Sequence, residues 1–203
     1  MREFPTQKTN LLKMGAAQMQ TNHLSHFILA AELCPLMEAE AAVTGEARCV
    51  FMSSGARATC EKKYLEKRYF EKHGGNLGDE GKSMLFATIV GGGKSFRYSQ
   101  SKLANSVMMY AMHEKLQAKG SKVKVFCAHP GGSRTTLGDN IELPWLEWML
   151  MKYVLMPMFQ SAEDGTLGEL IGMMAEDAQS GVLYEPLGKG GLAGPAVPNP
   201  PQP

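Results

Sequence analysis

Cysteine is scarce in the sequence, and its spacing excludes two common kinds of small protein. The 203 residues include four cysteines, Cys34, Cys49, Cys60 and Cys127, and no two of them form a Cys-x-x-Cys pair. Structural zinc sites and disulfide-stapled domains both depend on closely or regularly spaced cysteines. We therefore expect reduced thiols, a cytoplasmic location and no metal site.

Long apolar runs and net charge are also lacking. No stretch reaches the roughly 18 consecutive apolar residues of a membrane-spanning helix, and the amino terminus holds no signal-peptide core. The formal net charge is +1, which gives no electrostatic reason to expect nucleic acid as a partner. Hydrophobic residues make up 44% and charged residues 20% of the chain, which indicates an ordinary globular domain.

Helix-like and strand-like patterns alternate along the chain. Apolar residues recur every three or four positions in the former, while the latter are short apolar runs. In chain order, the sequence predicts a helix at 17–42, a strand at 47–54, a helix at 96–119, a strand at 122–132, a helix at 161–181 and a strand at 182–186. This order predicts an α/β fold of parallel strands joined by helices, with ligands beyond the carboxyl ends of the strands.

Three further segments do not fit the alternation. Residues 61–75 carry charges of both signs around aromatic residues, which predicts a solvated surface helix inside an insertion at about 57–95. Residues 191–203 are rich in proline and predict a flexible tail after a domain at 1–190. For residues 143–159, rich in Met, Leu and Trp, a buried or half-buried helix is favoured; a membrane-surface helix or a cap over an apolar pocket is the alternative.

Two glycine-rich stretches resemble nucleotide-binding loops without meeting their requirements. Gly91–Ser95 ends like a phosphate-binding loop, but Thr88 occupies the position where that loop needs its first glycine. Gly188–Ala193 satisfies a loose dinucleotide-binding pattern, but Pro195 and the prolines behind it exclude the helix that the pattern must open. We therefore expect neither a triphosphatase nor a dinucleotide loop at these positions.

Tyr98 and Lys102 offer a different chemistry, because residues four apart lie on one face of a helix. A nearby ammonium favours the phenolate and lowers the pKa of a tyrosine toward working pH, which makes the tyrosine a general acid/base. The same spacing also occurs by chance on many helices. Taken alone, the pair therefore favours no more than a structural role.

Four segments together give this pair its context. In chain order, they are Gln20–Phe27, Val50–Ala56, Tyr98–Asn105 and His129–Leu137. In this order they resemble the landmarks of the short-chain dehydrogenase/reductase family, and most of all the branch that contains the retinol dehydrogenases. The resemblance extends from about Gln18 to Pro186, because the closing helix and strand of that branch are similar to this chain as well.

The resemblance implies a catalytic role for four residues. Tyr98 would exchange a proton with the substrate oxygen, and Lys102 would lower the pKa of Tyr98 and hold the nicotinamide ribose. Ser54 would hydrogen-bond the substrate oxygen and stabilise its developing charge. Asn22 would fix a kink and a water in the first long helix and complete a proton relay to Lys102.

The resemblance also implies a cofactor, NADP or NAD. Besides Tyr98 and Lys102, the backbone of Pro130 and Gly131 and the hydroxyl of Thr135 would contact the nicotinamide end. The charges that select between the two cofactors follow the second strand of the fold, so the choice stays open. Three histidines, His23, His26 and His129, are expected in helix-face or loop roles rather than as metal ligands.

The family's opening glycine-rich turn and its Asn-Asn-Ala-Gly turn are absent from the sequence. We therefore expect a Rossmann-like parallel sheet with flanking helices but without the N-terminal strands of that fold. The strand at Cys49–Met52 would then have an unpaired apolar edge. For the chain by itself we expect weak cofactor binding and no turnover.

Two functions follow from this reading. The first is an NAD(P)-dependent oxidoreductase that interconverts an alcohol and a carbonyl, with a lipophilic substrate suggested by residues 143–159. The alternative is an inactive remnant that binds a protein partner through the open sheet edge. Peripheral membrane contact and a homo-oligomer are compatible with both functions, and the sequence decides neither.

Overall fold

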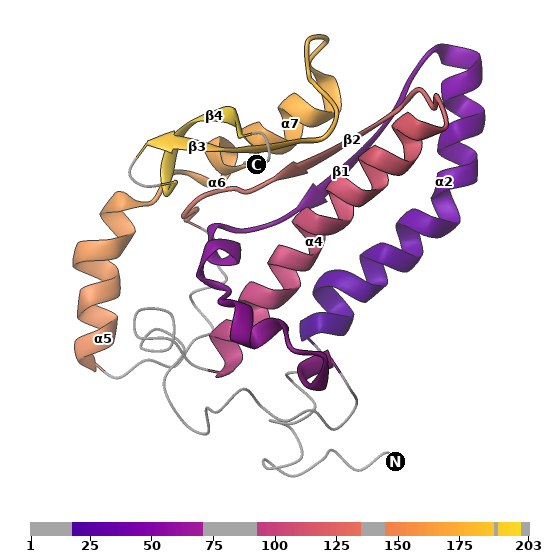
Figure 1. Ribbon diagram of the computed structural model, residues 1–203. Coiled ribbons are helices and arrows are strands. Elements are labelled where there is room, and N and C mark those ends of the chain that lie inside the picture. The colour runs from indigo at the N-terminus through magenta and orange to yellow at the C-terminus, as the bar shows by residue number, and fades with distance from the viewer. Residues whose placement is uncertain (1–17, 71–92, 135–144, 189–190, 200–203) are drawn as a thin grey trace, which may run out of the picture.

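The computed structural model describes residues 18–70, 93–134, 145–188 and 191–199. In these residues the chain forms one four-stranded sheet with the order β1-β2-β3-β4 (Figure 1). The strands are β1 (Ala47–Met52), β2 (Val123–Ala128), β3 (Val182–Gly188) and β4 (Ala193–Asn199). The first three strands are parallel and β4 is antiparallel to β3, which confirms the predicted α/β fold and its three predicted strands.

Helices cover both faces of the sheet. One face is covered by α2 (Ser25–Thr44) and α4 (Gly93–Ala118), the two long helices that the sequence predicts. The other face is covered by α7 (Leu167–Met174), which follows the short helix α6 (Ala162–Gly165). This three-layer arrangement is the one expected when parallel strands are joined by helices.

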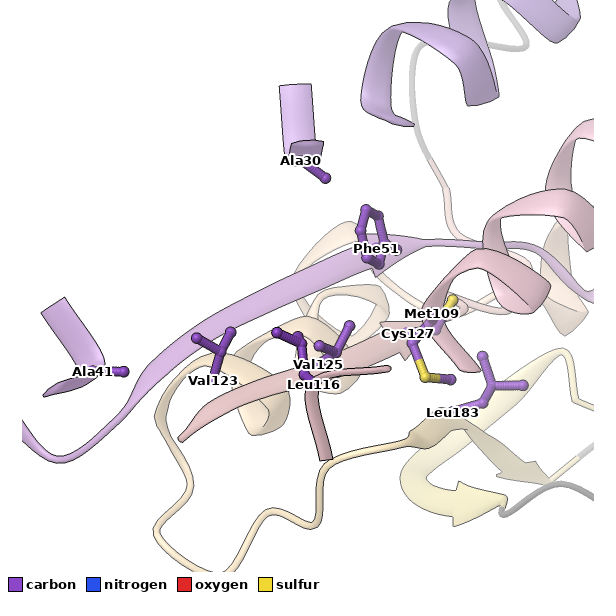
Figure 2. Close-up of a cluster of buried hydrophobic side chains, with 9 residues drawn as sticks. All are labelled: Ala30, Ala41, Phe51, Met109, Leu116, Val123, Val125, Cys127 and Leu183. Atoms are coloured by element: carbon purple, nitrogen blue, oxygen red, sulfur yellow. The ribbon is translucent and has the colours of Figure 1, made fainter. Parts of the chain in front are cut away.

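Strand β2 carries the core because its side chains alternate between the two faces. Val123, Val125 and Cys127 pack with Met109 and Leu116 of α4 in one buried cluster, shown in Figure 2. The residue between them, Phe126, belongs to a second cluster on the opposite face, with Val182, Tyr184 and Ala178. A strand that is buried on both faces is an inner strand of such a sheet. The carboxyl end of β2 therefore lies between those of its two parallel neighbours, β1 and β3.

Two glycines bring α7 directly onto the sheet. A Cβ atom on Gly172 would lie 3.2 Å from the Cβ atom of Phe126 and 3.2 Å from Cγ2 of Val50. A Cβ atom on Gly168 would lie 3.3 Å from that of Ala128. Small residues at these positions therefore set the distance between helix and sheet.

The helix predicted for residues 161–181 is shorter than expected. The Ser161 hydroxyl accepts a hydrogen bond from the Asp164 N–H at 3.0 Å, so the predicted start is correct. The chain forms α6 and α7 and leaves the helix at Met174, seven residues before Gly181. The sequence pattern does not show that the chain leaves the helix after Met174 and places Ala178 in the core.

The predicted surface helix at 61–75 is wrong for its described part. Short 3₁₀ turns form at Lys62–Leu65 and Lys67–Phe70, and the rest of the predicted insertion up to 92 lies outside the described residues. Tyr64 is buried, stacks on Phe96 with ring centroids 4.0 Å apart, and accepts a hydrogen bond from Gln100 at its carbonyl. The segment is therefore anchored to α4 by an aromatic contact that a charge pattern does not reveal.

The prediction of a flexible tail is wrong for residues 193–199, which form β4. This strand lies at the edge of the sheet, where some backbone N–H groups point away from the neighbouring strand. Proline, which has no N–H, is tolerated at such positions. Pro195 and Pro198 are both exposed. The Gly188–Ala193 stretch is followed by strand β4 and not by a helix, so it is not a dinucleotide-binding loop.

The buried or half-buried helix favoured for residues 143–159 is helical in its described part, but it is more exposed than predicted. Its described part forms α5 (Trp145–Leu150), the π-helical segment η6 (Met151–Leu155) and the 3₁₀ turn η7 (Met156–Met158), with most large side chains exposed. Periodicity alone does not tell a buried apolar helix from an exposed one. Among the described residues, no helix has the length and apolar content needed to cross a bilayer.

Candidate active site

The candidate site lies where the carboxyl ends of β1 and β2 meet the first half of α4 (Figure 1). Ser53 and Ser54 follow β1, and the hydroxyl of buried Ser53 donates to the Lys102 carbonyl of α4 at 2.8 Å. The turn Gly55–Thr59 continues along the same helix, with the Thr59 and Ser99 hydroxyls 2.9 Å apart. This is the edge at which α/β sheets bind ligands.

The structure confirms that Tyr98 and Lys102 share a face of α4. The Lys102 Nζ atom lies 5.7 Å from the centre of the Tyr98 ring, and burial lowers the pKa of the Lys102 ammonium. Among the described residues, its one hydrogen bond is a long one, 3.4 Å to the Met52 carbonyl. Because an ammonium has three donors, two remain for the oxygen atoms of a bound molecule.

Asn22 lies in the π-helical segment η1 (Gln20–Leu24) that leads into α2. The sequence analysis expects a kink at this residue, and a π-helical turn is an irregularity of that kind, often found at functional sites. The Asn22 side chain donates to the Ser101 hydroxyl of α4 at 3.1 Å, and its carbonyl accepts from Asn105 at 2.8 Å. It does not contact Lys102 directly, so the proton relay stays a prediction.

Asn105 joins these elements and was not singled out from the sequence. Its side-chain N–H₂ donates to the Asn22 carbonyl and, at 2.9 Å, to the Met52 carbonyl that also accepts from Lys102. Its Oδ1 atom is 3.0 Å from Nδ1 of His23, which gives that histidine a helix-face role. The signal was available: positions 98, 102 and 105 are four and three residues apart and so lie on one helix face.

Ser54 is half-buried at the start of the turn after β1. Its hydroxyl accepts from the Ala56 N–H at 3.3 Å, and its carbonyl accepts from the backbone N–H of Arg57 at 3.0 Å and from the guanidinium at 3.3 Å. The guanidinium also forms an ion pair with Glu185 of β3 at 2.5 Å. Arg57 thus ties the Ser54 turn to the third strand, a link between distant segments that the sequence does not show.

The turn after β2 is fixed by His129. Burial, reinforced by the nearby positive charge of Arg57, lowers the pKa of this imidazole to about 4. The neutral ring accepts a hydrogen bond from the Gly131 N–H at Nδ1, 2.9 Å away. Gly131 has φ +67° and a Cβ there would lie 2.5 Å from the Leu192 carbonyl oxygen, so only glycine fits this turn.

Two backbone groups predicted to face a nicotinamide are already paired within the chain. The Pro130 carbonyl accepts from the Ser133 hydroxyl at 2.9 Å and from the Gln160 amide at 2.8 Å, and the Gly131 N–H is bonded to His129. A cofactor contact at this turn would therefore use other backbone atoms. Thr135, the remaining predicted contact, lies outside the described residues.

The site's residues fit one end of a nicotinamide cofactor. The two spare donors of Lys102 suit a pair of ribose hydroxyls, and Tyr98 lies one helical turn away on the same face. In this family the pyrophosphate end of such a cofactor needs a Gly-x-x-x-Gly-x-Gly turn between a strand and a helix, and the sequence of this chain does not contain that spacing. Among the described hydrogen bonds, none joins Ser54 to Tyr98, so their joint contact with a substrate is a prediction.

Comparisons with known proteins show what this chain is similar to. No model of a protein family matches the sequence. The chain is 32% identical over 148 residues to retinol dehydrogenase 14 of Mus musculus, and 32% identical over 149 residues to that of Homo sapiens. Each match covers 73% of this chain, and the chain spans 37% of the length of each relative.

A solved structure shows the same fold. The crystal structure of an uncharacterized protein from Mycobacterium paratuberculosis superposes with a TM-score of 0.52 and 24% sequence identity, covering 90% of this chain and 50% of that one. Together with the strand order, this likeness establishes a Rossmann-like α/β fold with flanking helices.

The similarity to retinol dehydrogenases confirms the resemblance to the short-chain dehydrogenase/reductases that the sequence analysis describes. The roles of the individual site residues stay predictions.

Proposed function

We propose that this chain carries the catalytic residues of an NAD(P)-dependent oxidoreductase that interconverts a lipophilic alcohol and its carbonyl compound. The observation that supports this most directly is Lys102, a half-buried lysine with spare donors, held beside Tyr98 at the carboxyl end of β1. Its relatives are named retinol dehydrogenases, so retinol is the first substrate to test.

The cofactor, when bound, supplies or accepts the hydride. Tyr98 then has to give a proton to the substrate oxygen, or take one from it, and the Lys102 ammonium lies on the same face of the helix. The Ser54 hydroxyl donates a hydrogen bond to the same oxygen and stabilises the charge that develops there. Asn105 holds the Met52 carbonyl, and together with Asn22 it joins η1 to α4, which supports the position of Lys102.

A hybrid protein tests this function. The part of retinol dehydrogenase 14 that precedes the matched region, fused to residues 18–186 of this chain, supplies the missing pyrophosphate-binding turn. We expect the hybrid to oxidise retinol with NAD or NADP, and Tyr98→Phe to lower kcat by about 10² or more. Gln117→Ala, at an exposed position near the carboxyl end of α4, is the control. A folded hybrid without activity, or one whose activity survives Tyr98→Phe, would contradict the proposal.

A second candidate function has one observation in its favour. Strand β1 is at the edge of the sheet, with β2 as its only neighbour among the described residues, and α2 exposes Leu33, Leu36 and Val43 beside it. Such an edge can pair with a strand of another protein. We expect partner binding, if it occurs, to slow hydrogen exchange of the β1 amides. Exchange that a candidate partner leaves unchanged would rule out docking of that partner through this edge.

A further inference from the structure

The turn that carries Ser54 is held between two elements that lie far apart in the sequence. At the far end of the turn, the Thr59 hydroxyl lies 2.9 Å from that of Ser99 on α4. At the near end, the Arg57 guanidinium reaches Glu185 of β3 at 2.5 Å and the Ser54 carbonyl at 3.3 Å. The turn is therefore fastened both to the helix of the candidate site and to the third strand of the sheet.

Close contacts restrict the backbone of Ser54 between these two ends. The residue is extended, with φ −157° and ψ 153°, and its carbonyl accepts from both the backbone and the side chain of Arg57. A Cβ atom on Gly55 would lie 3.0 Å from Nε2 of His129, so this part of the turn packs against the residue that follows β2. The Ala56 N–H then donates to the Ser54 hydroxyl oxygen at 3.3 Å and sets the direction of that side chain.

The ion pair between Arg57 and Glu185 has a defined geometry. The two side chains are 16% and 23% exposed, so little water competes with the contact. The second carboxylate oxygen of Glu185 accepts from the Asn199 side chain of β4, which orients the carboxylate. A guanidinium is planar and donates in fixed directions. Its bonds to Glu185 and to the Ser54 carbonyl therefore fix the distance between strand and turn.

We propose that Arg57 and Glu185 position the Ser54 hydroxyl at the candidate active site. The catalytic use of this position rests on the proposed function, in which Ser54 donates to the substrate oxygen. Such a donor is effective only at hydrogen-bond distance from the developing charge, and a misplacement of about 1 Å can cost about 10²-fold in rate. Arg57 and Glu185 act through Ser54 and need no contact with substrate, so they are positioning residues.

Amide hydrogen exchange of the 203-residue chain, followed by NMR, measures this position without substrate or cofactor. The reporter is the Ala56 N–H, whose acceptor is the Ser54 hydroxyl. The reference is the Ser53 N–H, which donates to the Ala128 carbonyl of β2 at 2.7 Å. Glu185→Ala changes no residue of the turn. We expect it to speed exchange at Ala56 by about tenfold or more, while exchange at Ser53 changes by less than about twofold.

Further variants separate the ion pair from other causes. Glu185→Gln keeps the shape and one acceptor oxygen but loses the charge, and it should speed exchange of the reporter amide by only about threefold. Arg57→Lys keeps the charge and should preserve part of the protection that Arg57→Ala removes. Glu61→Ala is the matched control, because it breaks an ion pair with Lys63 whose side chains are 58% and 59% exposed. It should leave the reporter amide unchanged.

Three results would overturn the proposal. Equal acceleration at Ser53 and Ala56 in Glu185→Ala would assign the ion pair to the stability of the whole sheet. Unchanged exchange at Ala56 would show that the turn holds Ser54 without help from β3. An equal effect of Glu61→Ala would show that the loss of any ion pair loosens the turn. None of these results bears on the proposed function, whereas an inactive hybrid together with the expected exchange pattern would contradict the proposed function and still support the positioning pair.

Discussion

At the scale of single residues, the candidate site depends on polar groups that are satisfied by one another across three elements. The Met52 carbonyl at the end of β1 accepts from both Lys102 and Asn105, and Asn105 reaches back to Asn22. Since Asn105 is buried, its two contacts are partly shielded from competing water. The position of the Lys102 ammonium is therefore set by its neighbours as much as by its own helix.

Asn105→Ala should remove this support. The Asn22 and Met52 carbonyls would each lose a donor, and we expect the free energy of unfolding to fall by about 1–3 kcal/mol. Urea unfolding, followed by circular dichroism, measures the loss. Gln117→Ala, at an exposed position of the same helix, is the control and should change the free energy by less than about 0.5 kcal/mol. An equal effect of both substitutions would contradict the role assigned to Asn105.

His129 should make stability depend on pH. Its pKa is about 4 in the folded chain and about 6.5 when unfolded, so between these values the unfolded state binds more protons. The free energy of unfolding should therefore rise with pH from about 4 to about 6.5, by up to roughly 3 kcal/mol, and be insensitive to this residue above that range.

The measurement compares urea unfolding at several pH values for the unaltered chain and for His129→Gln. Glutamine can still accept the hydrogen bond from the Gly131 N–H, but it does not titrate. The rise with pH should be smaller in the variant. Parallel pH profiles for the two proteins would show that His129 titrates normally in the folded state.

At the scale of elements, the packing of α7 on the sheet depends on Gly168 and Gly172, which have no side chain that would separate the helix from the strands. Gly172→Val would place new atoms against Phe126 and Val50, which are already in contact distance of a Cβ. We expect a loss of about 1–3 kcal/mol in the free energy of unfolding. Met173→Ala, at the exposed neighbouring position, is the control. A Gly172→Val variant as stable as the unaltered chain would mean that α7 can lift from the sheet at no cost.

The sequence predicts the elements whose pattern is local and regular. The strands β1, β2 and β3 and the helices α2 and α4 follow from apolar runs and from three- and four-residue spacing. The failures have non-local causes. Residues 193–199 form β4 because they pair with β3 at the edge of the sheet. The 3₁₀ turns at Lys62–Leu65 and Lys67–Phe70 are held to α4 by the stacking of Tyr64 on Phe96. The exposure of α5 depends on where the chain turns, which periodicity does not encode.

The candidate site divides in the same way. Tyr98 and Lys102 were predictable because four-residue spacing fixes their common face, and Asn105 lies at the next position of that face. Arg57 and Glu185 were not predictable as a pair, because 128 residues separate them and only the sheet brings them together. The paired Pro130 carbonyl likewise depends on Gln160, which reaches it from beyond η7.

At the scale of the whole molecule, the chain combines a candidate active site with surfaces that are left uncovered. Among the described residues, β1 has an open edge and α5 exposes its aromatic side chains. The chain spans 37% of the length of its relatives, and its own sequence has no pyrophosphate-binding turn. Without that turn, we expect cofactor to bind weakly and the chain alone to show no turnover.

Thermal unfolding of the 203-residue chain with NADPH, NADH and ATP tests the central claim most directly, because a ligand that binds the folded state raises its melting temperature. The account predicts a small rise with NADPH or NADH at high concentration, its loss in Lys102→Ala, and no rise with ATP. Protection by ATP alone, or protection by NADPH that Lys102→Ala leaves intact, would contradict it.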